Sequence, residues 1–397
     1  MSEISDMIQR LCPDGVEYRK LGEVCLRQKG IAITAQQMKD LHKEGAPIRI
    51  FAGGSTYADV DYTDVPSYID KESVVVKSRG NIGFEYRDKP FTHKNEMWSY
   101  SQKSEGLINM KYVFYYLQNN AVYFQKLAKT GKLPQIATPD TDNFEIPVPP
   151  LEVQRKIVEV LDNFSELTAE LTAELEARKK QYEYYRDNLL NFSQIAPNSV
   201  KWMKISEVFE IRNGYTPSKA KAEFWESGTI PWFRMEDIRQ NGRILSDSIL
   251  HITSEGVKGK GLFKANSFIL ATTATIGEHA LIIADSLANQ QFTNLKICKS
   301  LEKELTIKYV FYYLFVVDEW CKANTNVSGF ASVDMAKFKN LLFPIPPLSE
   351  QERIVSILDR FESLTTDLTS GLPAEIKARQ QQYEYYRDQL LTFKRAN

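Results

Sequence analysis

The sequence lacks the patterns that mark membrane-spanning, secreted and metal-binding proteins. Among its 397 residues, no apolar run approaches the roughly 20 residues that a membrane helix needs. The segment Met1–Arg10 has no apolar signal core, so we expect a cytoplasmic location. The four cysteines form no C-x-x-C pair and the four histidines no H-x-x-x-H pair. These spacings argue against a zinc knuckle, a disulfide framework and a catalytic metal site.

Motifs of nucleotide chemistry are also missing. A DNA adenine methyltransferase needs a glycine-rich cofactor loop and an Asn/Asp-Pro-Pro-aromatic tetrapeptide, but the Pro-Pro pairs here stand in Val148–Leu151 and Ile345–Leu348 without either flank. The glycine pair at 53–54 predicts a turn, and no G-x-x-x-x-G-K-[ST] loop exists, which excludes an ATP motor. Asp14 and Glu17 lie too close in sequence for two nuclease metal ligands from different strands. We therefore expect a chain that is not an enzyme.

Positive charge is scarce for a DNA-binding protein. The net charge is −1, and the contents of 43% hydrophobic and 25% charged residues are those of an ordinary soluble globular protein. A protein that bound DNA tightly by itself would carry more Lys and Arg against the phosphates. The chain therefore either does not bind DNA or binds it with the help of a more basic partner.

What the sequence does contain is a duplication of itself. Residues 147–192 begin P-V-P-P-L-E-V-Q-R-K-I-V-E-V-L-D and end Y-E-Y-Y-R-D-N-L-L-N-F. Residues 344–393 begin P-I-P-P-L-S-E-Q-E-R-I-V-S-I-L-D and end Y-E-Y-Y-R-D-Q-L-L-T-F, so that Gln154 and Gln351 occupy the same place. Such a duplication gives one chain approximate twofold symmetry, which suits a nearly twofold partner such as duplex DNA.

Each copy also has a globular part of mixed character. Residues 73–77 and 267–271 read as strands followed by glycine turns, and K-Y-V-F-Y-Y-L at 111–117 and 308–314 begins an aromatic-faced helix. We predict an α+β fold built from two copies of one domain. The predicted parts are globular domains at 1–147 and 196–344 and helical regions at 148–195 and 345–397.

An apolar seam runs along each helical region. Its residues recur three, four or seven apart, as in a coiled coil. Because a globular domain separates the two helices in sequence, they can lie antiparallel and cover one another, which predicts a pseudo-twofold antiparallel coiled coil. The seam residues are Ile157, Leu161, Phe164, Leu171, Leu175, Tyr182, Tyr185, Leu189 and Phe192, and then Ile354, Leu358, Phe361, Leu368, Leu372, Ile376, Tyr383, Tyr386, Leu390 and Phe393.

The two helical regions differ in length. The first contains T-A-E-L twice in tandem, at 168–171 and 172–175. A tetrapeptide is close to one helical turn, so adding or removing a unit keeps the helix but changes its length and phase. The second has Gly371 and Pro373 instead, where we expect a break or kink.

These motifs resemble the DNA-specificity (S) subunits of type I restriction–modification systems. The duplicated P-P-L-x-x-Q-x-x-I-V-x-x-L-D and Q-Y-E-Y-Y-R-D-x-L-L carry the resemblance, and the tandem T-A-E-L units are similar to the type IC group. The second globular half adds G-Y-T-P-S at 214–218, I-P-W at 230–232 and N-Q-Q at 289–291. The first half reads G-I-A-I at 30–33 where G-x-T-P-S would stand, so its DNA contacts are less transferable.

The resemblance implies a reader of split DNA sequences. Each globular half would be a target recognition domain for one half of the target, and the helices would act as a spacer that docks two methyltransferase (M) subunits. Those partners would methylate adenine with S-adenosylmethionine, and restriction (R) subunits with ATP and Mg²⁺ could join them. No cofactor is expected in this chain. The alternatives are a stand-alone DNA-binding regulator, which would need more positive charge, and an interaction scaffold with no dependence on DNA.

Candidate DNA contacts follow from the residue types that bind phosphates and base edges. The first domain offers a basic strand–turn–strand, for which a solvated hairpin is the alternative. The second offers the loop around Gly214. We expect the nearby Trp225 to pack in the core, and Gln290 could equally be a buried side chain bonded to the backbone. The candidates are Lys77, Ser78, Arg79, Asn81, Arg87, Lys89 and Lys94, and then Arg212, Asn213, Tyr215, Thr216, Ser218, Lys219, Lys221, Lys258, Lys260, Thr273 and Gln290.

Tyrosines repeated near the end of each helical region are candidates for subunit docking. In the first copy, positions 182 and 185 share a helical face while 184 points elsewhere. The extra aromatic residue predicts a surface for partner helices. The six candidates are Tyr182, Tyr184, Tyr185, Tyr383, Tyr385 and Tyr386.

Overall fold

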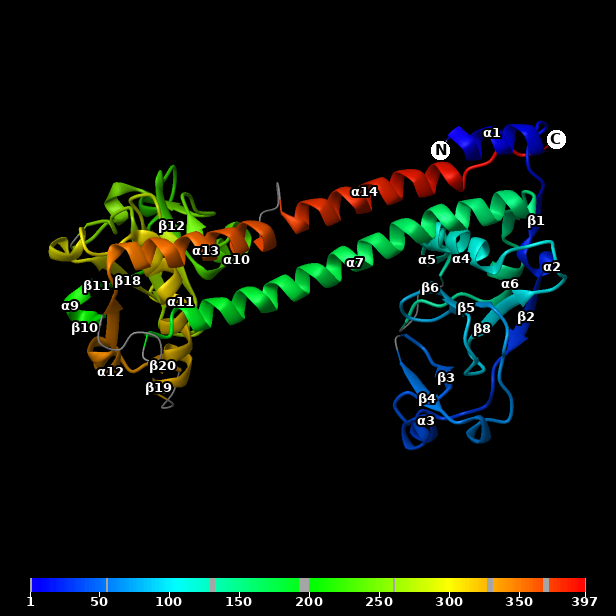
Figure 1. Cartoon of the computed structure of the whole chain (residues 1–397), viewed down its shortest axis with the longest axis horizontal. Helices are drawn as coiled ribbons and strands as arrows, with labels where there is room; N and C mark the ends of the chain where they lie inside the picture. The colour runs from blue at the N-terminus through cyan, green and yellow to red at the C-terminus, as the bar shows by residue number, and fades with distance from the viewer. Residues whose placement is uncertain are drawn as a thin grey trace. The chain divides into compact units, whose positions relative to one another are not determined.

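The computed structural model describes residues 2–54, 56–128, 133–192, 200–259, 261–326, 331–366 and 371–396. The chain divides into two compact units. The first comprises Met1–Thr172 with Glu375–Asn397, and the second comprises Ala173–Ala374. Both divisions fall within the predicted helical regions, so each unit contains one globular domain and helical segments from both regions (Figure 1).

In its described residues, the first globular domain contains two sheets and a strand pair. The four-stranded antiparallel sheet has the order β2-β8-β5-β6 and the three-stranded sheet the order β4-β3-β7, while β1 pairs with β9. Alternation on β5 turns Val74 and Val76 into the main core and Val75 toward a smaller cluster with Phe51 and Phe91. The strands are β1 Tyr18–Lys20, β2 Cys25–Lys29, β3 Ile48–Phe51, β4 Tyr57–Val60, β5 Ser73–Lys77, β6 Gly83–Arg87, β7 Phe91–His93, β8 Trp98–Gln102 and β9 Glu145–Pro147.

Helix α4 is the central helix of this domain. Its N-cap residue Asn109 accepts hydrogen bonds from the backbone N–H groups of Lys111 and Tyr112, which satisfies two donors of the first turn. Tyr112 and Val113 are fully buried in the main core. The helices are α1 Ser2–Leu11, α2 Leu21–Val24, α3 Ala35–Leu41, α4 Met110–Asn119, α5 Ala121–Leu127 and α6 Thr138–Asp142, with a 3-10 turn at Tyr62–Asp64.

The second globular domain repeats this plan with a larger sheet. Its strand orders are β11-β18-β15-β16-β13 and β14-β12-β17, with the pairs β10-β21 and β19-β20. The parallel pair β12–β17 corresponds to the parallel pair β3–β7 of the first domain. The strands are β10 Lys201–Lys204, β11 Phe209–Asn213, β12 Ile230–Phe233, β13 Ile244–Leu245, β14 His251–Ile252, β15 Ser267–Ala271, β16 His279–Ile282, β17 Leu287–Ala288, β18 Phe292–Ile297, β19 Thr325–Asn326, β20 Ser332–Val333 and β21 Leu342–Ile345.

Helix α11 takes the place of α4 in the second domain. Thr306 caps it by accepting from the backbone N–H of Tyr309, and Tyr309 and Tyr312 are fully buried. The helices are α9 Ile205–Val208, α10 Met235–Asn241, α11 Ile307–Ala323 and α12 Met335–Asn340, with 3-10 turns at Ala222–Phe224, Ser254–Gly256 and Lys299–Leu301. The predicted strands at 73–77 and 267–271 and both K-Y-V-F-Y-Y-L helices are thereby confirmed.

The long helices in the described residues are α7 Leu151–Leu189, α13 Leu348–Thr366 and α14 Leu372–Leu390. In the first unit the ring of Phe164 on α7 lies 5.4 Å from that of Tyr386 on α14, which runs in the opposite direction (Figure 1). In the second unit Tyr185 on α7 stacks on Phe361 of α13 at 5.4 Å. The antiparallel pairing is therefore confirmed within each unit.

The start of each long helix is covered by more than the seam prediction named. Ile157 and Leu161 lie in one core with Leu390 of the other helical region, as predicted, and also with α4 residues such as Tyr112. Ile354 and Leu358 are likewise buried with Leu190 and with α11 residues. The start of each long helix is thus part of a globular core as well as of the helix seam.

The predicted break in the second helical region corresponds to the start of a new helix. Helix α13 ends at Thr366 and α14 begins at Leu372, with Pro373 in its first turn, where the missing N–H group of proline costs no hydrogen bond. Leu368 of the predicted seam lies outside the described residues. Over the parts of the chain that are described, no helix is long and apolar enough to cross a membrane.

Candidate DNA interface

A close backbone crossing occurs at the same place in both domains. A Cβ atom on Gly214 would lie 2.1 Å from the carbonyl oxygen of Asn289, and one on Gly30 would lie 2.4 Å from that of His93. Only glycine allows such an approach. The first domain therefore builds the crossing that Gly214 makes in the second, although it lacks G-x-T-P-S.

The crossing in the second domain presents a hydroxyl and an amide at the surface. Thr216 donates from Oγ1 to Oε1 of Gln290 at 2.5 Å, and Gln290 is exposed. Gln291 instead is half-buried, and its carbonyl oxygen accepts from the Thr272 N–H at 2.9 Å. The candidate Gln290 is thus more exposed than its neighbour, and an exposed amide can meet a base edge.

Tyr215 and Trp225 link this loop to the rest of the domain through hydrogen bonds to backbone groups. The hydroxyl of Tyr215 accepts from the Lys258 N–H at 2.7 Å and donates to Gly256 O at 3.2 Å. The indole N–H of Trp225 donates to Ser218 O at 3.1 Å, and its ring meets that of Trp232 edge-on. Trp225 is half-buried and packs against the core cluster that contains Trp232, in line with the core packing favoured for it.

The basic candidates of the second domain divide into engaged and exposed groups. Arg212 donates to Gly261 O at 2.7 Å and to Leu262 O at 3.1 Å, and Lys221 pairs with Glu223 at 3.2 Å. Asn213 accepts a hydrogen bond from Thr293, and Thr273 is half-buried. Asn213 and Lys221 are exposed despite these partners, as are Ser218, Lys219 and Lys258, whereas Lys260 lies outside the described residues.

In the first domain, several candidates already have partners within the protein. Lys77 pairs with Glu85 at 2.6 Å and Lys94 with Glu96 at 3.1 Å. Ser78 is buried, and its hydroxyl donates to Glu96 O at 2.8 Å. DNA contacts from these three side chains would require a change of partner. The exposed candidates are Arg79, Asn81 and Lys89.

Arg87 belongs to an arginine pair that the sequence did not reveal. Arg49 on β3 forms a bidentate pair with Asp59 at 2.7 and 3.0 Å and lies 4.0 Å above the ring of Tyr57. The Arg49 hydrogen bond holds the pKa of Asp59 below its usual value. Burial, and then the charge of Arg49, lower the pKa of Arg87. The carboxylates of Asp59, Asp88 and Glu85 act on Arg87 in the opposite direction, so its guanidinium already has acidic neighbours within the protein.

Two further residues at the crossings were missed. Asn95 stands in the first domain where Gln290 stands in the second, because the same backbone turn joins Lys94 to Met97 and Asn289 to Phe292. Asn95 is exposed. An alignment of K-N-E-M with N-Q-Q-F would have found it.

Arg234 is the other missed residue. It directly follows Phe233, whose carbonyl accepts from the Asn289 N–H at 3.0 Å, so it begins beside the same crossing. Its Nη1 pairs with Glu236 at 2.9 Å, and its buried Nε has no hydrogen-bond partner within the described part of the chain. In the sequence, the place of Arg234 two positions after the I-P-W motif could have indicated it as a candidate DNA contact.

The docking tyrosines separate into seam and surface residues. Tyr182 and Tyr185 both contact the ring of Phe361, and Tyr386 contacts Phe164. Tyr184 is 66% exposed and Tyr385 59% exposed. Tyr184 and Tyr385 are thus the most exposed rings of the two motifs, while Tyr185 is 40% exposed although it contacts Phe361.

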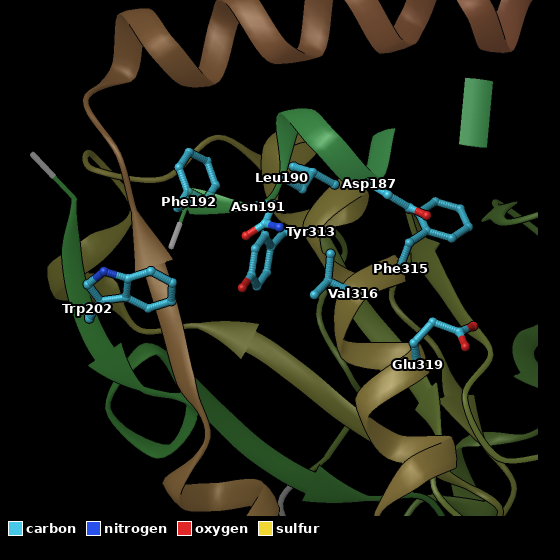
Figure 2. Close-up of a pocket in the computed structure, with 9 residues that line it drawn as sticks. All are labelled: Asp187, Leu190, Asn191, Phe192, Trp202, Tyr313, Phe315, Val316 and Glu319. Carbon is cyan, nitrogen blue, oxygen red and sulfur yellow. The ribbon is translucent and has the colours of Figure 1, made fainter. Parts of the chain in front are cut away.

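A pocket of about 410 Å³ lies in the second unit between the end of α7 and α11. Figure 2 shows Trp202 and Phe192 around it together with Tyr313 and Phe315. Its charged lining residues are Asp187 and Glu319, which would repel phosphate. The pocket therefore does not extend the candidate DNA interface.

The sequence matches a family model along two stretches. The model describes the type I restriction modification DNA specificity domain, and it matches residues 13–178 and 197–378. One match falls on each globular domain and the helix that follows it. The chain belongs to this type I specificity family.

Curated relatives agree with this family. The EcoR124I/EcoR124II specificity subunit of Escherichia coli is 34% identical over 412 residues, which cover 99% of this chain and 98% of that protein. The EcoprrI specificity subunit of Escherichia coli is 54% identical over 202 residues, and this match spans 49% of the chain and 50% of the relative. As a member of the family, the chain has a role in DNA target specificity.

Solved specificity subunits share the fold. The type I S subunit of M. genitalium covers 95% of this chain and 96% of its own length, with a TM-score of 0.56 and 15% identity. The HsdS subunit of Thermoanaerobacter tengcongensis gives a TM-score of 0.53 at 18% identity and covers 96% of this chain and 97% of its own. The predicted fold of two α+β domains and long helices is thereby confirmed for this specificity subunit.

Proposed function

We propose that this chain selects the DNA target of a type I restriction–modification complex and that each globular domain reads one half of a split sequence. The observation that carries the proposal is the repeated glycine crossing. Each crossing exposes an amide side chain at the same turn, Gln290 in the second domain and Asn95 in the first. Amide side chains can make paired hydrogen bonds to adenine in the major groove. Two equivalent readers with different side chains suit a target whose halves differ in sequence.

The long helices are proposed to dock two methyltransferase subunits, one at each Y-E-Y-Y-R-D motif. Tyr184 and Tyr385 support this role because large exposed aromatic residues are enriched at the centres of protein interfaces. The methyltransferase subunits would bring S-adenosylmethionine, and restriction subunits, where they join, ATP and Mg²⁺. A basic partner would also supply phosphate contacts that a chain of net charge −1 provides sparsely.

Single-molecule methylome sequencing tests this proposal. A cell would express the chain with the methyltransferase subunit encoded beside it, and a matched cell would lack the chain. We expect a split motif methylated at adenine, with a fixed gap, that disappears in the matched cell. Methylation that persists without the chain would refute the proposal and favour a regulator or scaffold.

A further inference from the structure

A fully buried glutamine ties each globular domain to its long helix. The side chain of Gln154, in the first turn of α7, is 0% exposed. Its Oε1 accepts from the Asn109 N–H at 2.8 Å, and its Nε2 donates to Leu107 O at 3.1 Å and to Pro149 O at 2.7 Å. Asn109 is the N-cap residue of α4. One amide therefore connects the start of α4, the exit from β9 and the start of α7.

The second copy repeats this connection atom for atom. Gln351 is also 0% exposed. Its Oε1 accepts from the N–H of Thr306, the N-cap residue of α11, at 2.9 Å. Its Nε2 donates to Glu304 O at 2.7 Å and to Pro346 O at 2.9 Å. The loops of the two domains have diverged, yet this buried amide makes the same bonds in both.

A second contact lies about 12 Å further along each long helix, since the two positions are eight residues apart. Asp162 on α7 accepts from Lys111 Nζ at 2.8 Å and from the Tyr115 hydroxyl at 2.6 Å. Asp359 on α13 accepts from Lys308 Nζ at 2.9 Å and from the Tyr312 hydroxyl at 2.6 Å. Contacts at two heights prevent the long helix from both sliding along the domain and rotating against it.

A third contact fixes the chain where it leaves the sheet. The hydroxyl of Tyr112 donates to Pro147 O at 3.1 Å, and that of Tyr309 donates to Pro344 O at 3.0 Å. Both tyrosines are fully buried. We call the glutamine, the aspartate and these tyrosine contacts the joint of each unit.

We infer that Gln154 and Gln351 are positioning residues that set the register in which each domain reads its half of the target. The inference rests on the proposed function and adds to it that helix length alone does not define the gap. One base pair corresponds to about 3.4 Å along DNA and roughly one tenth of a turn. A joint that slipped or rotated by that amount would let a domain engage a half-site one base pair away. The buried amide opposes this movement because its donors and acceptors would lose their partners.

The test uses Gln154→Met and Gln351→Met in the complete complex with its methyltransferase subunits. Methionine keeps the volume and shape of glutamine but makes none of its hydrogen bonds. Methylation would be measured on a library of targets that keep both half-sequences and vary the gap by one base pair in each direction. Gln380→Met is the matched control, because Gln380 is exposed on α14. Tyr115→Phe is a milder variant that removes only the hydroxyl bound to Asp162.

We expect each joint variant to methylate both half-sequences while its preference for the native gap falls about tenfold, which corresponds to ~1.4 kcal/mol. Tyr115→Phe should shift the same preference less, and Gln380→Met should leave it unchanged. An unchanged gap preference in Tyr115→Phe and in an assembled glutamine variant would overturn the inference. So would a loss of one half-sequence at an undiminished gap preference, since the glutamine would then only maintain the fold of its domain. If the wild-type complex showed no split target, the proposed function itself would fail.

Discussion

Gln290 is the residue whose side chain most directly exposes hydrogen-bonding capacity at the crossing of the second domain. We expect Gln290→Ala to weaken discrimination at one position of the second half-sequence by about 1–3 kcal/mol, the usual worth of a paired amide–base contact. The measurement is methylation of targets that carry each single-base change in that half. The first half-sequence is the internal control, and a loss of its specificity would contradict separate readers.

Gly30 tests whether the crossing in the first domain is structurally required. A methyl group there would lie 2.4 Å from the His93 carbonyl oxygen, so Gly30→Ala should lower the free energy of unfolding by about 1–3 kcal/mol. Gly53→Ala is the control in the same domain, because no atom lies within 4 Å of the added group. Thermal unfolding of the two variants gives the comparison. Equal stability of the two variants would show that the crossing can relax.

Residue types were predictable from the sequence, but their partners were not. Lys77 and Lys94 carried the charge expected of DNA contacts, yet each has a carboxylate within reach, Glu85 across the hairpin and Glu96 on the next turn. The first pair depends on strand register and the second on a local turn, neither of which composition contains. The bond from Thr216 to Gln290 joins residues 74 positions apart in sequence. The two residues meet only because the backbone segments approach each other closely at Gly214, which the sequence does not show.

At the scale of elements, the exposed tyrosines of the long helices allow the proposed docking of the methyltransferase subunits to be tested. We expect Tyr184→Glu combined with Tyr385→Glu to abolish co-purification of the methyltransferase subunits, because a carboxylate would have to be buried in an apolar interface. Tyr62→Glu is the control, since Tyr62 is exposed to 48% but lies in the first globular domain. Wild-type recovery of the partners by the double variant would exclude this surface as the docking site.

Helical periodicity identified the long helices but not everything that covers them. It placed Ile157 and Leu161 on an apolar face, and both are buried. A period of three to four residues says that a face must be covered and does not say by what. The cover comes from Leu390 of α14 and also from α4, whose aromatic residues belong to the same repeated pattern. The sequence shows that the glutamine is duplicated. Its role could be recognised only from the positions of the three backbone groups to which it is hydrogen-bonded.

At the scale of the whole molecule, the duplication explains why each unit draws on distant parts of the chain. The first unit takes its long helices from residues up to Thr172 and from Glu375 onward, and the second unit takes Ala173–Ala374. Each unit therefore contains one joint and one antiparallel helix contact. A mutation in one joint therefore alters one unit, whereas a change in the length of α7 at the division alters helical segments of both units.

The tandem T-A-E-L units lie at this division, which falls between Thr172 and Ala173 within the second tetrapeptide. Inserting a third T-A-E-L after Leu175 should extend α7 by about 6 Å, or one turn, while both joints remain intact. The unread gap should then lengthen by roughly one to two base pairs, since each adds about 3.4 Å, with both half-sequences unchanged. Methylome sequencing of cells with the lengthened chain measures both quantities. Altered half-sequences at an unchanged gap would show that the helices do not act as a spacer.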